Sequence, residues 1–280
     1  MSSEKRRRAR VQGSWAPPPR KPQEKKEASR AMPEVGVSSP VRKPQPPQFA
    51  YVESGQAIRT PPPVIRIESA SDETIISDGP TGKSILRYYP QFIEEKELQR
   101  IFQTLCKELP WKQRFDVKRD GTSYKQPRMT AWYGDLSYAY SGVVLPPSES
   151  WHPLVLQLRE RIEKKPKYTF NSVLGNLYRN EYDSVDWHSD DEAGLRDFPI
   201  IASLTFGDMR IFKMRKKPPL EEKGDYTYQQ HIEVPLPSGS LLIMEGATQA
   251  DWQHSIPKSY HSKGPRVNLT YRTIYPVEEI

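Results

Sequence analysis

The sequence Arg266-Val267-Asn268-Leu269-Thr270-Tyr271-Arg272 alternates charged or polar side chains with apolar or aromatic ones. Successive side chains of a β-strand point to opposite faces of the sheet, so this alternation predicts a strand with one polar face. That face would carry Arg266 and Arg272. Buried guanidinium groups need anionic partners, because an unpaired buried ion costs several kcal/mol. A polar face inside the fold therefore predicts an anion site, whereas an exposed strand edge would explain the pattern without a ligand.

Strand-like segments occupy much of the chain before this stretch. Turn sequences such as Gly207-Asp208 and Pro237-Ser238-Gly239 separate some of them, and many short strands with such turns are typical of a β-sandwich, a jelly roll or a small barrel. The predicted strands cover residues 171–178, 199–206, 209–214, 228–234, 240–244 and 266–275.

Two helices and a hairpin are predicted outside this region. Apolar residues recur at helical spacing over residues 93–109 and stop at Pro110. A second helix should begin at Pro153, a residue favoured at the first helical position, and end before Pro166. Residues 117–140 are rich in Tyr and Trp and contain Asp120-Gly121, a hairpin-turn sequence. We therefore expect an α+β protein.

The first 65 residues differ in composition from the rest. Twelve of the 28 prolines lie between Pro17 and Pro63, without apolar periodicity, which predicts disorder. This segment holds thirteen Lys or Arg and five Glu, a charge of +8 where the whole chain has +7. The remainder is close to neutral, so phosphate binding there would need local basic patches. We expect a disordered, basic, Pro-rich tail over residues 1–65 and one folded domain over residues 66–280.

Several features predict an intracellular protein. Cys106 has no second cysteine to pair with, the start of the chain lacks the apolar segment of a signal peptide, and no apolar run is long enough to span a membrane. The cluster Lys5-Arg6-Arg7-Arg8-Ala9-Arg10 fits a nuclear-localisation or nucleic-acid-contacting signal, or a merely solvating basic terminus. We expect a monomer in the nucleus and cytoplasm.

A metal site is indicated by Trp187-His188-Ser189-Asp190, which contains a His-x-Asp pair, and by His254, 64 residues further on. Two imidazoles and one carboxylate form the facial triad of non-haem Fe(II), which leaves positions open for a co-substrate and O₂. A zinc hydrolase is the rival interpretation. The chain lacks both a His-Glu-x-x-His helix and a cysteine pair, so zinc is less favoured.

The other histidines fit the triad less well. His231-Ile232-Glu233 is also a His-x-acid pair, but strand alternation places His231 and Glu233 on the polar face of a half-buried strand. His152 and His261 have no carboxylate nearby in the sequence. We expect His152 to pack at the start of a helix and His261 to lie in an exposed loop.

The combination of His-x-Asp…His with Arg-x-Asn-x-Thr-x-Arg resembles the AlkB family of dioxygenases. The resemblance covers about residues 85–276 and is specific, and the segments 127–134, 176–181 and 244–254 are similar to one vertebrate branch of that family. It implies a double-stranded β-helix (jelly roll), with Fe(II) held by His188, Asp190 and His254. It also implies that 2-oxoglutarate contacts Asn176, Tyr178, Arg266, Asn268 and Arg272.

By the same resemblance, the enzyme would remove N-methyl groups from 1-methyladenine and 3-methylcytosine in single-stranded DNA and RNA, with release of formaldehyde, succinate and CO₂. A methyl group on the pairing edge is reachable only in an unpaired or flipped base. A recognition hairpin or lid near residues 111–140 is expected, with basic clusters at 118–119 and 215–217 near phosphates. Contacts with the base are expected from Asp191, near the exocyclic amine, and from Trp111, Arg128 and Tyr140. Barrel packing or an ordinary surface is the alternative interpretation for these four residues.

Two further expectations concern the pocket and the tail. Leu174 shares a strand face with Asn176 and Tyr178, so in the absence of substrate it is a candidate for self-hydroxylation, with plain packing as the alternative. The tail is a candidate site for a helicase-like partner. Two other functions stay open from sequence: a 2-oxoglutarate hydroxylase acting on protein side chains or metabolites, and a non-catalytic nucleic-acid-binding module.

Overall fold

The computed structural model describes residues 60–117, 121–140, 143–148, 150–164, 168–222 and 224–276. Most of the predicted disordered tail lies outside these residues, and its disorder stays a prediction. Strand pairing begins next to the predicted domain boundary at residue 66, where β1 (Ile65–Arg66) pairs in parallel with β12 (His231–Leu236), and the boundary itself stays a prediction.

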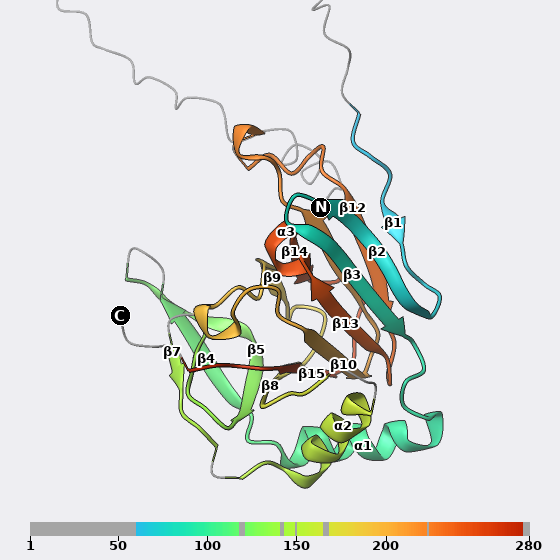
Figure 1. Ribbon diagram of the computed structural model, residues 1–280. Helices are drawn as coiled ribbons and strands as arrows, with labels where there is room; N and C mark the ends of the chain where they lie inside the picture. Colours follow the sequence, from blue (N-terminus) through green and yellow to red (C-terminus); the bar gives the residue numbers. More distant parts are fainter. Residues whose placement is uncertain are drawn as a thin grey trace, which may run out of the picture. The chain divides into compact units, whose positions relative to one another are not determined.

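Two sheets face each other across the molecule (Figure 1). This confirms the predicted jelly roll. The five-stranded sheet has the order β1, β12, β11 (Arg210–Lys216), β14 (Trp252–Ile256) and β9 (Val185–His188). The eight-stranded sheet has the order β2 (Ser71–Gly79), β3 (Gly82–Tyr89), β13 (Leu241–Gly246), β10 (Ile201–Gly207), β15 (Arg266–Arg272), β8 (Ser172–Tyr178), β5 (Ser123–Gly134) and β4 (Lys112–Val117).

The structure contains strands that the sequence pattern did not predict. β2 lies at an edge of its sheet and buries none of its side chains fully, so it lacks the alternation that marks a half-buried strand. β9 and β14 are short, and each carries a histidine, His188 or His254, that faces the pocket between the sheets. Two further strands, β6 (Tyr138–Tyr140) and β7 (Val143–Leu145), form a small hairpin.

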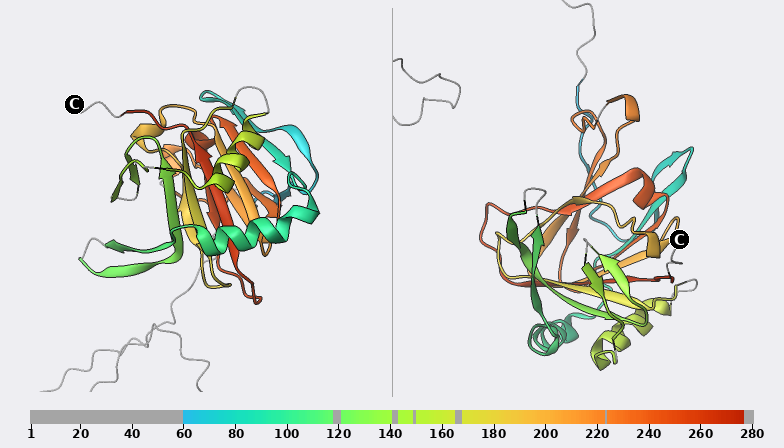
Figure 2. Two further views of the ribbon diagram at one scale, coloured as in Figure 1. Left: turned by 90° about the horizontal axis from the view of Figure 1, so that it is seen from below. Right: turned by 90° about the vertical axis from the view of Figure 1, so that its left-hand side faces the viewer.

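Both predicted helices are present. α1 (Glu95–Glu108) and α2 (Pro153–Glu163) lie across the outer face of the eight-stranded sheet (Figure 2). His152 caps α2, as expected for a residue at the start of a helix, by accepting a hydrogen bond from the Leu154 N–H. The shorter helical turns are α3 (Thr248–Asp251), η3 (Ala193–Leu195) and η4 (Leu220–Glu222). Within the described ranges, no helix has the length and apolar character needed to cross a membrane.

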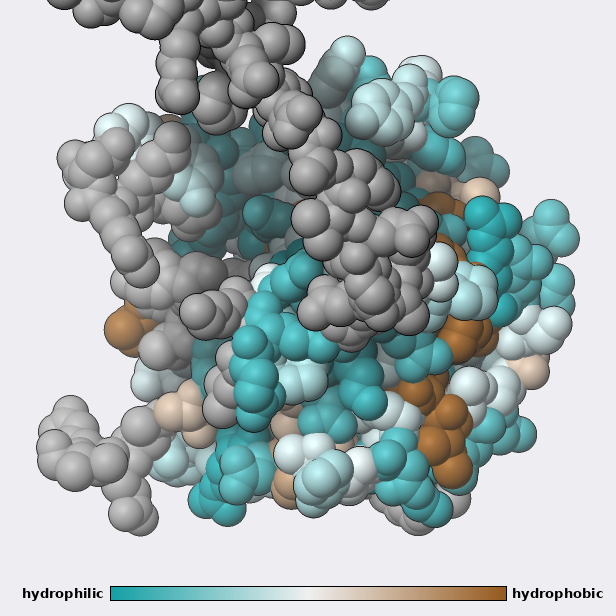
Figure 3. All heavy atoms as spheres, turned by 90° about the horizontal axis from the view of Figure 1, so that it is seen from above, coloured by the Kyte–Doolittle hydropathy of each residue, from teal (hydrophilic) through white to brown (hydrophobic). Residues whose placement is uncertain are grey.

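β15 separates two apolar clusters, one on each face of the eight-stranded sheet. Val267, Leu269 and Tyr271 point toward the helices, where the Tyr271 hydroxyl donates to the Val155 carbonyl. A second cluster fills the space between the sheets and includes Leu174 and Met214. Outside these clusters, hydrophilic side chains cover most of the described surface visible in Figure 3. The polar face of β15 lies on the same side as this second cluster, so it is enclosed between the two sheets. The interpretation of this stretch as an exposed strand edge is wrong.

Trp111, which we expected near the substrate base, packs on the opposite face of the eight-stranded sheet. Its indole N–H donates to the Leu105 carbonyl of α1 at 3.0 Å. Its ring lies against Gly175, where a Cβ would come within 3.1 Å of the ring. The side chains before and after Gly175 line the space between the sheets, so Gly175 and Trp111 lie on the helix side. This placement favours the packing role for Trp111, and its base contact stays a prediction.

We expect Trp111→Ala to lower the free energy of unfolding by about 3 kcal/mol, because it removes a large side chain from the helix-side cluster. Urea unfolding followed by circular dichroism would measure the change. Phe115→Ala is the matched control: Phe115 also belongs to β4 but is 52% exposed, so its loss should have little effect. Equal stabilities of Trp111→Ala and the wild type would contradict this packing role.

Candidate metal and co-substrate site

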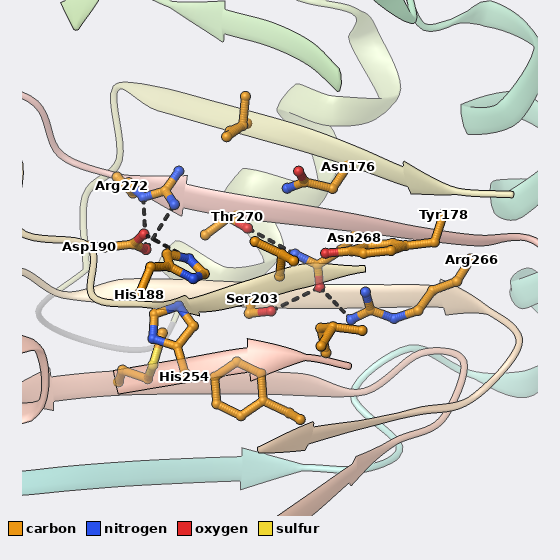
Figure 4. A pocket seen from close by; sticks show the side chains of 15 residues that line it. Asn176, Tyr178, His188, Asp190, Ser203, His254, Arg266, Asn268, Thr270 and Arg272 are labelled. Atoms are coloured by element: carbon orange, nitrogen blue, oxygen red, sulfur yellow. Dashed lines mark hydrogen bonds and ion pairs between the residues drawn. The ribbon is translucent and has the colours of Figure 1, made fainter. Parts of the chain in front are cut away.

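His188, Asp190 and His254 converge between the two sheets (Figure 4). His188 ends β9, and its register partner on the neighbouring strand β14 is His254, so the two rings lie with centroids 4.2 Å apart. Asp190 follows two residues after His188. One ligand atom from each of the three residues lies within 4.8 Å of the others. The predicted triad is thus assembled by pairing between two strands distant in sequence.

Each of the two histidines can present a ring nitrogen to a metal. His188 Nδ1 lies 2.8 Å from the Asp186 carbonyl, which favours the proton on Nδ1 and leaves Nε2, 3.7 Å from Asp190 Oδ1, as the ligand atom. His254 stacks on Phe212 with a centroid separation of 5.2 Å. Burial, reinforced by the neighbouring His188, lowers the pKa of His254 to about 3, so its imidazole is neutral near pH 7.

Asp190 supplies the carboxylate. Its side chain is 1% exposed, and Oδ2 accepts hydrogen bonds from Arg272 Nη2 at 2.8 Å and Nε at 3.2 Å. Burial alone would raise its pKa, but Arg272 and then the two histidines outweigh burial and hold the pKa of Asp190 at about 2. Oδ1 is buried without a hydrogen-bond partner in the described part of the chain. A buried, ionised oxygen beside two imidazole nitrogens fits a divalent metal such as Fe(II).

The histidines outside the proposed triad lie where the sequence pattern predicted. His231 and Glu233 are half-buried on β12, whereas Ile232 between them is fully buried. Glu233 binds Lys213 at 2.8 Å and Arg66 at 3.4 Å, so its carboxylate is occupied by cations. His261 is exposed.

The polar face of β15 forms the wall of a pocket that continues from the metal triad. Figure 4 shows Arg272 beside the triad and Arg266 at the other end of the pocket. Arg266 is 1% exposed and donates from Nη2 to Asn268 Oδ1 at 2.8 Å and to Thr205 Oγ1 at 2.9 Å. Burial lowers the pKa of Arg266 to about 10, which still leaves it protonated near pH 7.

Buried donors in this pocket lack acceptors. Arg266 Nε and Nη1 and Arg272 Nη1 are buried and have no hydrogen-bond partner within the described ranges. Unsatisfied buried guanidinium donors are costly, so their presence at two points of one pocket indicates an anionic ligand that reaches both. A dicarboxylate such as 2-oxoglutarate fits, with one carboxylate near Arg266 and the other near Arg272 and the metal.

The other residues predicted to hold 2-oxoglutarate line the same pocket. On β8, Asn176 pairs in register with Asn268, and Tyr178 pairs with Arg266, whose guanidinium lies 5.0 Å from the Tyr178 ring centroid. Leu174 also lines the pocket, beside Asn176 in strand alternation. Strand pairing therefore brings all five predicted residues together, and the shared placement of Leu174 is confirmed.

Sequence reasoning missed Ser203, which lines the pocket, and Thr205, which supports a pocket residue. Ser203 and Thr205 on β10 each donate to Asn268 Oδ1, at 2.9 and 3.2 Å. Together with Arg266, they fix the orientation of the Asn268 amide. The available signal was the presence of two hydroxyl residues at alternate positions of an otherwise apolar strand.

The residues expected to contact the base lie at different distances from the pocket. Arg128 is buried on β5 and donates to Asn176 Oδ1 at 2.9 Å, so it supports a pocket residue directly. Asp191 follows the metal carboxylate, and its side chain is 67% exposed. Tyr140 ends β6, but its side chain lies outside the described residues. A base contact by these three residues stays a prediction.

Of the two expected phosphate-binding clusters, residues 118–119 lie outside the described residues. In the second cluster, Arg215 is held between the rings of Trp187 and Tyr226, 4.4 and 3.5 Å from their centroids. Its guanidinium also donates to Gln253. Arg215 therefore has a packing role, and Lys216 and Lys217 are the better candidates for phosphate contacts.

Comparison with known proteins agrees with this geometry. Residues 85–272 match the family model described as the 2OG-Fe(II) oxygenase superfamily. The chain is 50% identical to the human protein named alpha-ketoglutarate-dependent dioxygenase alkB homolog 3, over 98% of this chain and 97% of that protein. It is 49% identical to the mouse protein of that name over the same shares of each chain. The Arabidopsis thaliana DNA oxidative demethylase ALKBH2 is 34% identical over 75% of this chain and 74% of its own length.

The family match spans the triad, the arginine strand and the pocket between them, and the relatives named alkB homolog 3 match along nearly their whole length. The chain belongs to the AlkB family of Fe(II)- and 2-oxoglutarate-dependent dioxygenases.

Proposed function

We propose that this dioxygenase removes the methyl group from 1-methyladenine and 3-methylcytosine in single-stranded DNA and RNA. The products are the unmethylated base, formaldehyde, succinate and CO₂. The observation that carries the proposal is the pocket that joins a His-Asp-His cluster to two buried arginines with unpartnered donors. Relatives named as a DNA oxidative demethylase support nucleic acid as the substrate class.

The residues of this chain have positioning roles in the reaction. When bound, Fe(II), 2-oxoglutarate and O₂ supply the oxidation of the methyl carbon, and the hydroxymethyl group so formed is lost as formaldehyde. His188, Asp190 and His254 would hold the metal, while Arg266 and Asn268 would orient the distal carboxylate of 2-oxoglutarate. Arg272 has a double role, because it binds Asp190 and also has a donor available for the co-substrate. No nucleophile or general base from the protein is required.

Substrate recognition would occur at the exposed side of the triad. Asp191 is an acceptor for the exocyclic amine that adenine and cytosine share, and Lys217, whose Nζ lies 3.9 Å from Asp191 Oδ2, is a nearby cation for a phosphate. A methylated pairing edge weakens base pairing, which lowers the cost of taking the base out of a duplex. This favours single strands and damaged bases over intact duplex DNA.

Two earlier expectations remain proposals. Self-hydroxylation of Leu174 is supported by its place in the pocket with the triad. A helicase-like partner for the tail of residues 1–65 would supply the single strands that such an enzyme needs.

We expect His188→Ala and Asp190→Ala to abolish turnover of a 1-methyladenine oligonucleotide, because each removes a metal ligand, with little loss of oligonucleotide affinity. Formaldehyde and succinate should be measured together, and binding by fluorescence anisotropy. His231→Ala is the matched control and should remain active. An Asp190→Ala enzyme that demethylates at the wild-type rate would reject the triad.

The same assay separates the alternative functions. Succinate that forms only with a protein or metabolite substrate would indicate a hydroxylase of another class. Oligonucleotide binding without either product would indicate a binding module. Formaldehyde in a 1:1 ratio to succinate with the methylated oligonucleotide supports the proposed demethylase.

We expect Arg266→Met to raise the KM for 2-oxoglutarate by about 100-fold, in line with the loss of a charge-assisted contact of about 3 kcal/mol, and to leave the KM for the oligonucleotide nearly unchanged. Arg266 is the sharper test of the two arginines, because Arg272 also binds Asp190 and its loss would disturb the metal site. Initial rates at varied concentrations of each substrate would measure both constants. A rise in the oligonucleotide KM alone would assign Arg266 to a phosphate site.

The metal-free protein should lose stability as the pH falls below about 6.5, the ordinary pKa of histidine. Burial lowers the pKa of His254 to about 3, so the unfolded state takes up its proton first. The stability contribution of neutral His254 is therefore complete above pH 6.5 and is lost progressively toward pH 3. Urea unfolding of the metal-free protein across this range would measure the slope. His254→Gln should make the slope shallower, whereas the exposed His261→Ala should not.

A further inference from the structure

Gln249 connects the loop that carries Asp190 to the turn that precedes His254. It belongs to α3, between β13 and β14, and is 2% exposed. Its side-chain Oε1 accepts a hydrogen bond from the Asp190 backbone N–H at 2.9 Å. Its Nε2 donates to Met244 Sδ at 3.4 Å. Both ends of the buried amide are therefore used, which fixes its orientation.

A second bond joins the same two segments. Ser189, the residue between the two ligands of the His-x-Asp pair, donates from Oγ to the Trp252 carbonyl at 2.9 Å. β9 ends at His188, so Ser189 and Asp190 lie beyond its strand pairing. The position of Asp190 relative to His254 is therefore set by side-chain contacts with the α3 turn and by Arg272.

The contact with Arg272 alone would not place Asp190 for a metal. Arg272 binds Oδ2, and its remaining donor faces the pocket where we place the co-substrate. Gln249 instead holds the main chain of Asp190, through the Asp190 backbone N–H. Because Arg272 holds the carboxylate and Gln249 holds the main chain, Asp190 Oδ1 stays directed toward His188 Nε2, which is 3.7 Å away.

Gln249 also lies next to the proposed substrate side. Its backbone carbonyl accepts a hydrogen bond from Lys217 Nζ at 2.9 Å, and the same Nζ lies 3.9 Å from Asp191 Oδ2. Gln249 thus contacts Asp190 directly and is linked to Asp191 by way of Lys217.

We propose that Gln249 is a positioning residue for the metal carboxylate Asp190, acting through the Asp190 backbone N–H. The inference rests on the proposed metal site. Partners that orient metal ligands typically contribute 10- to 100-fold to metal affinity or activity. Removal of the Gln249 acceptor would also leave a buried N–H without a partner, which favours a displaced loop.

The test uses Mn(II), which binds such sites without turning over, added to the full-length metal-free protein with 2-oxoglutarate and followed by electron paramagnetic resonance. Gln249→Met keeps the length of the side chain and removes the acceptor, whereas Gln249→Glu keeps an acceptor at the same place. Gln229→Met is the matched control, because Gln229 is also buried but binds Glu222, outside the site. The melting temperature of each metal-free variant reports any general loss of stability.

We expect Gln249→Met to weaken Mn(II) binding about 10- to 100-fold. Gln249→Glu should bind Mn(II) more tightly than Gln249→Met, because it keeps the acceptor for the Asp190 N–H. Gln229→Met should bind Mn(II) normally, even if its melting temperature falls as much as that of Gln249→Met. Unchanged Mn(II) binding by folded Gln249→Met would overturn the proposal. An equal loss in the Met and Glu variants would also overturn it, since the acceptor would then not matter.

Two further variants complete the design. If Gln249→Met does not fold, Ser189→Ala, which removes the second bond of the same loop, should weaken Mn(II) binding in the same direction, and normal binding would overturn the proposal. His188→Ala tests the metal site itself. If His188→Ala binds Mn(II) as tightly as the wild type, the proposed metal site is wrong. If His188→Ala loses Mn(II) binding but Gln249→Met keeps the wild-type affinity, only the positioning role of Gln249 is wrong.

Discussion

The buried ion pair between Arg272 and Asp190 is the interaction on which the site depends. It joins the last residue of β15 in the eight-stranded sheet to the loop after β9 in the five-stranded sheet. It also keeps the Asp190 carboxylate ionised despite its burial. One contact thereby connects the two sheets, prepares a metal ligand and places a guanidinium donor beside the co-substrate pocket.

The strand that carries this arginine can hold charge in the interior because its other face contributes to the core. Val267, Leu269 and Tyr271 are fully buried against the helices, whereas Arg266, Asn268 and Arg272 line the pocket between the sheets. Apolar burial on one face offsets the desolvation of charged groups on the other. The guanidinium donors that have no partner within the described ranges still cost free energy. An anion that accepts hydrogen bonds from them would remove this cost.

The same organisation holds several site residues in place without any ligand. Asn268 Oδ1 accepts from Ser203, Thr205 and Arg266, and the His188 ring is oriented by the Asp186 carbonyl. Such contacts fix rotamers and tautomers in advance, so ligand binding does not have to order them. On the proposed substrate side, Asp191 is largely exposed, as a contact with a polymeric substrate would require.

The strand character of β15 and the two helices follow from the sequence alone, because alternation and helical spacing are local properties. The triad and the five residues expected to hold 2-oxoglutarate were predicted from the resemblance of their motifs to a known family. The sequence could not determine on which face of the sheet Trp111 packs, since that depends on Gly175 of a strand paired across the sheet. Nor could it reveal the partners of Ser203 and Gln249, which are 65 and 59 residues away. Ordinary polar residues acquire such roles only when tertiary pairing brings a distant acceptor or donor within hydrogen-bond distance and excludes water from the contact.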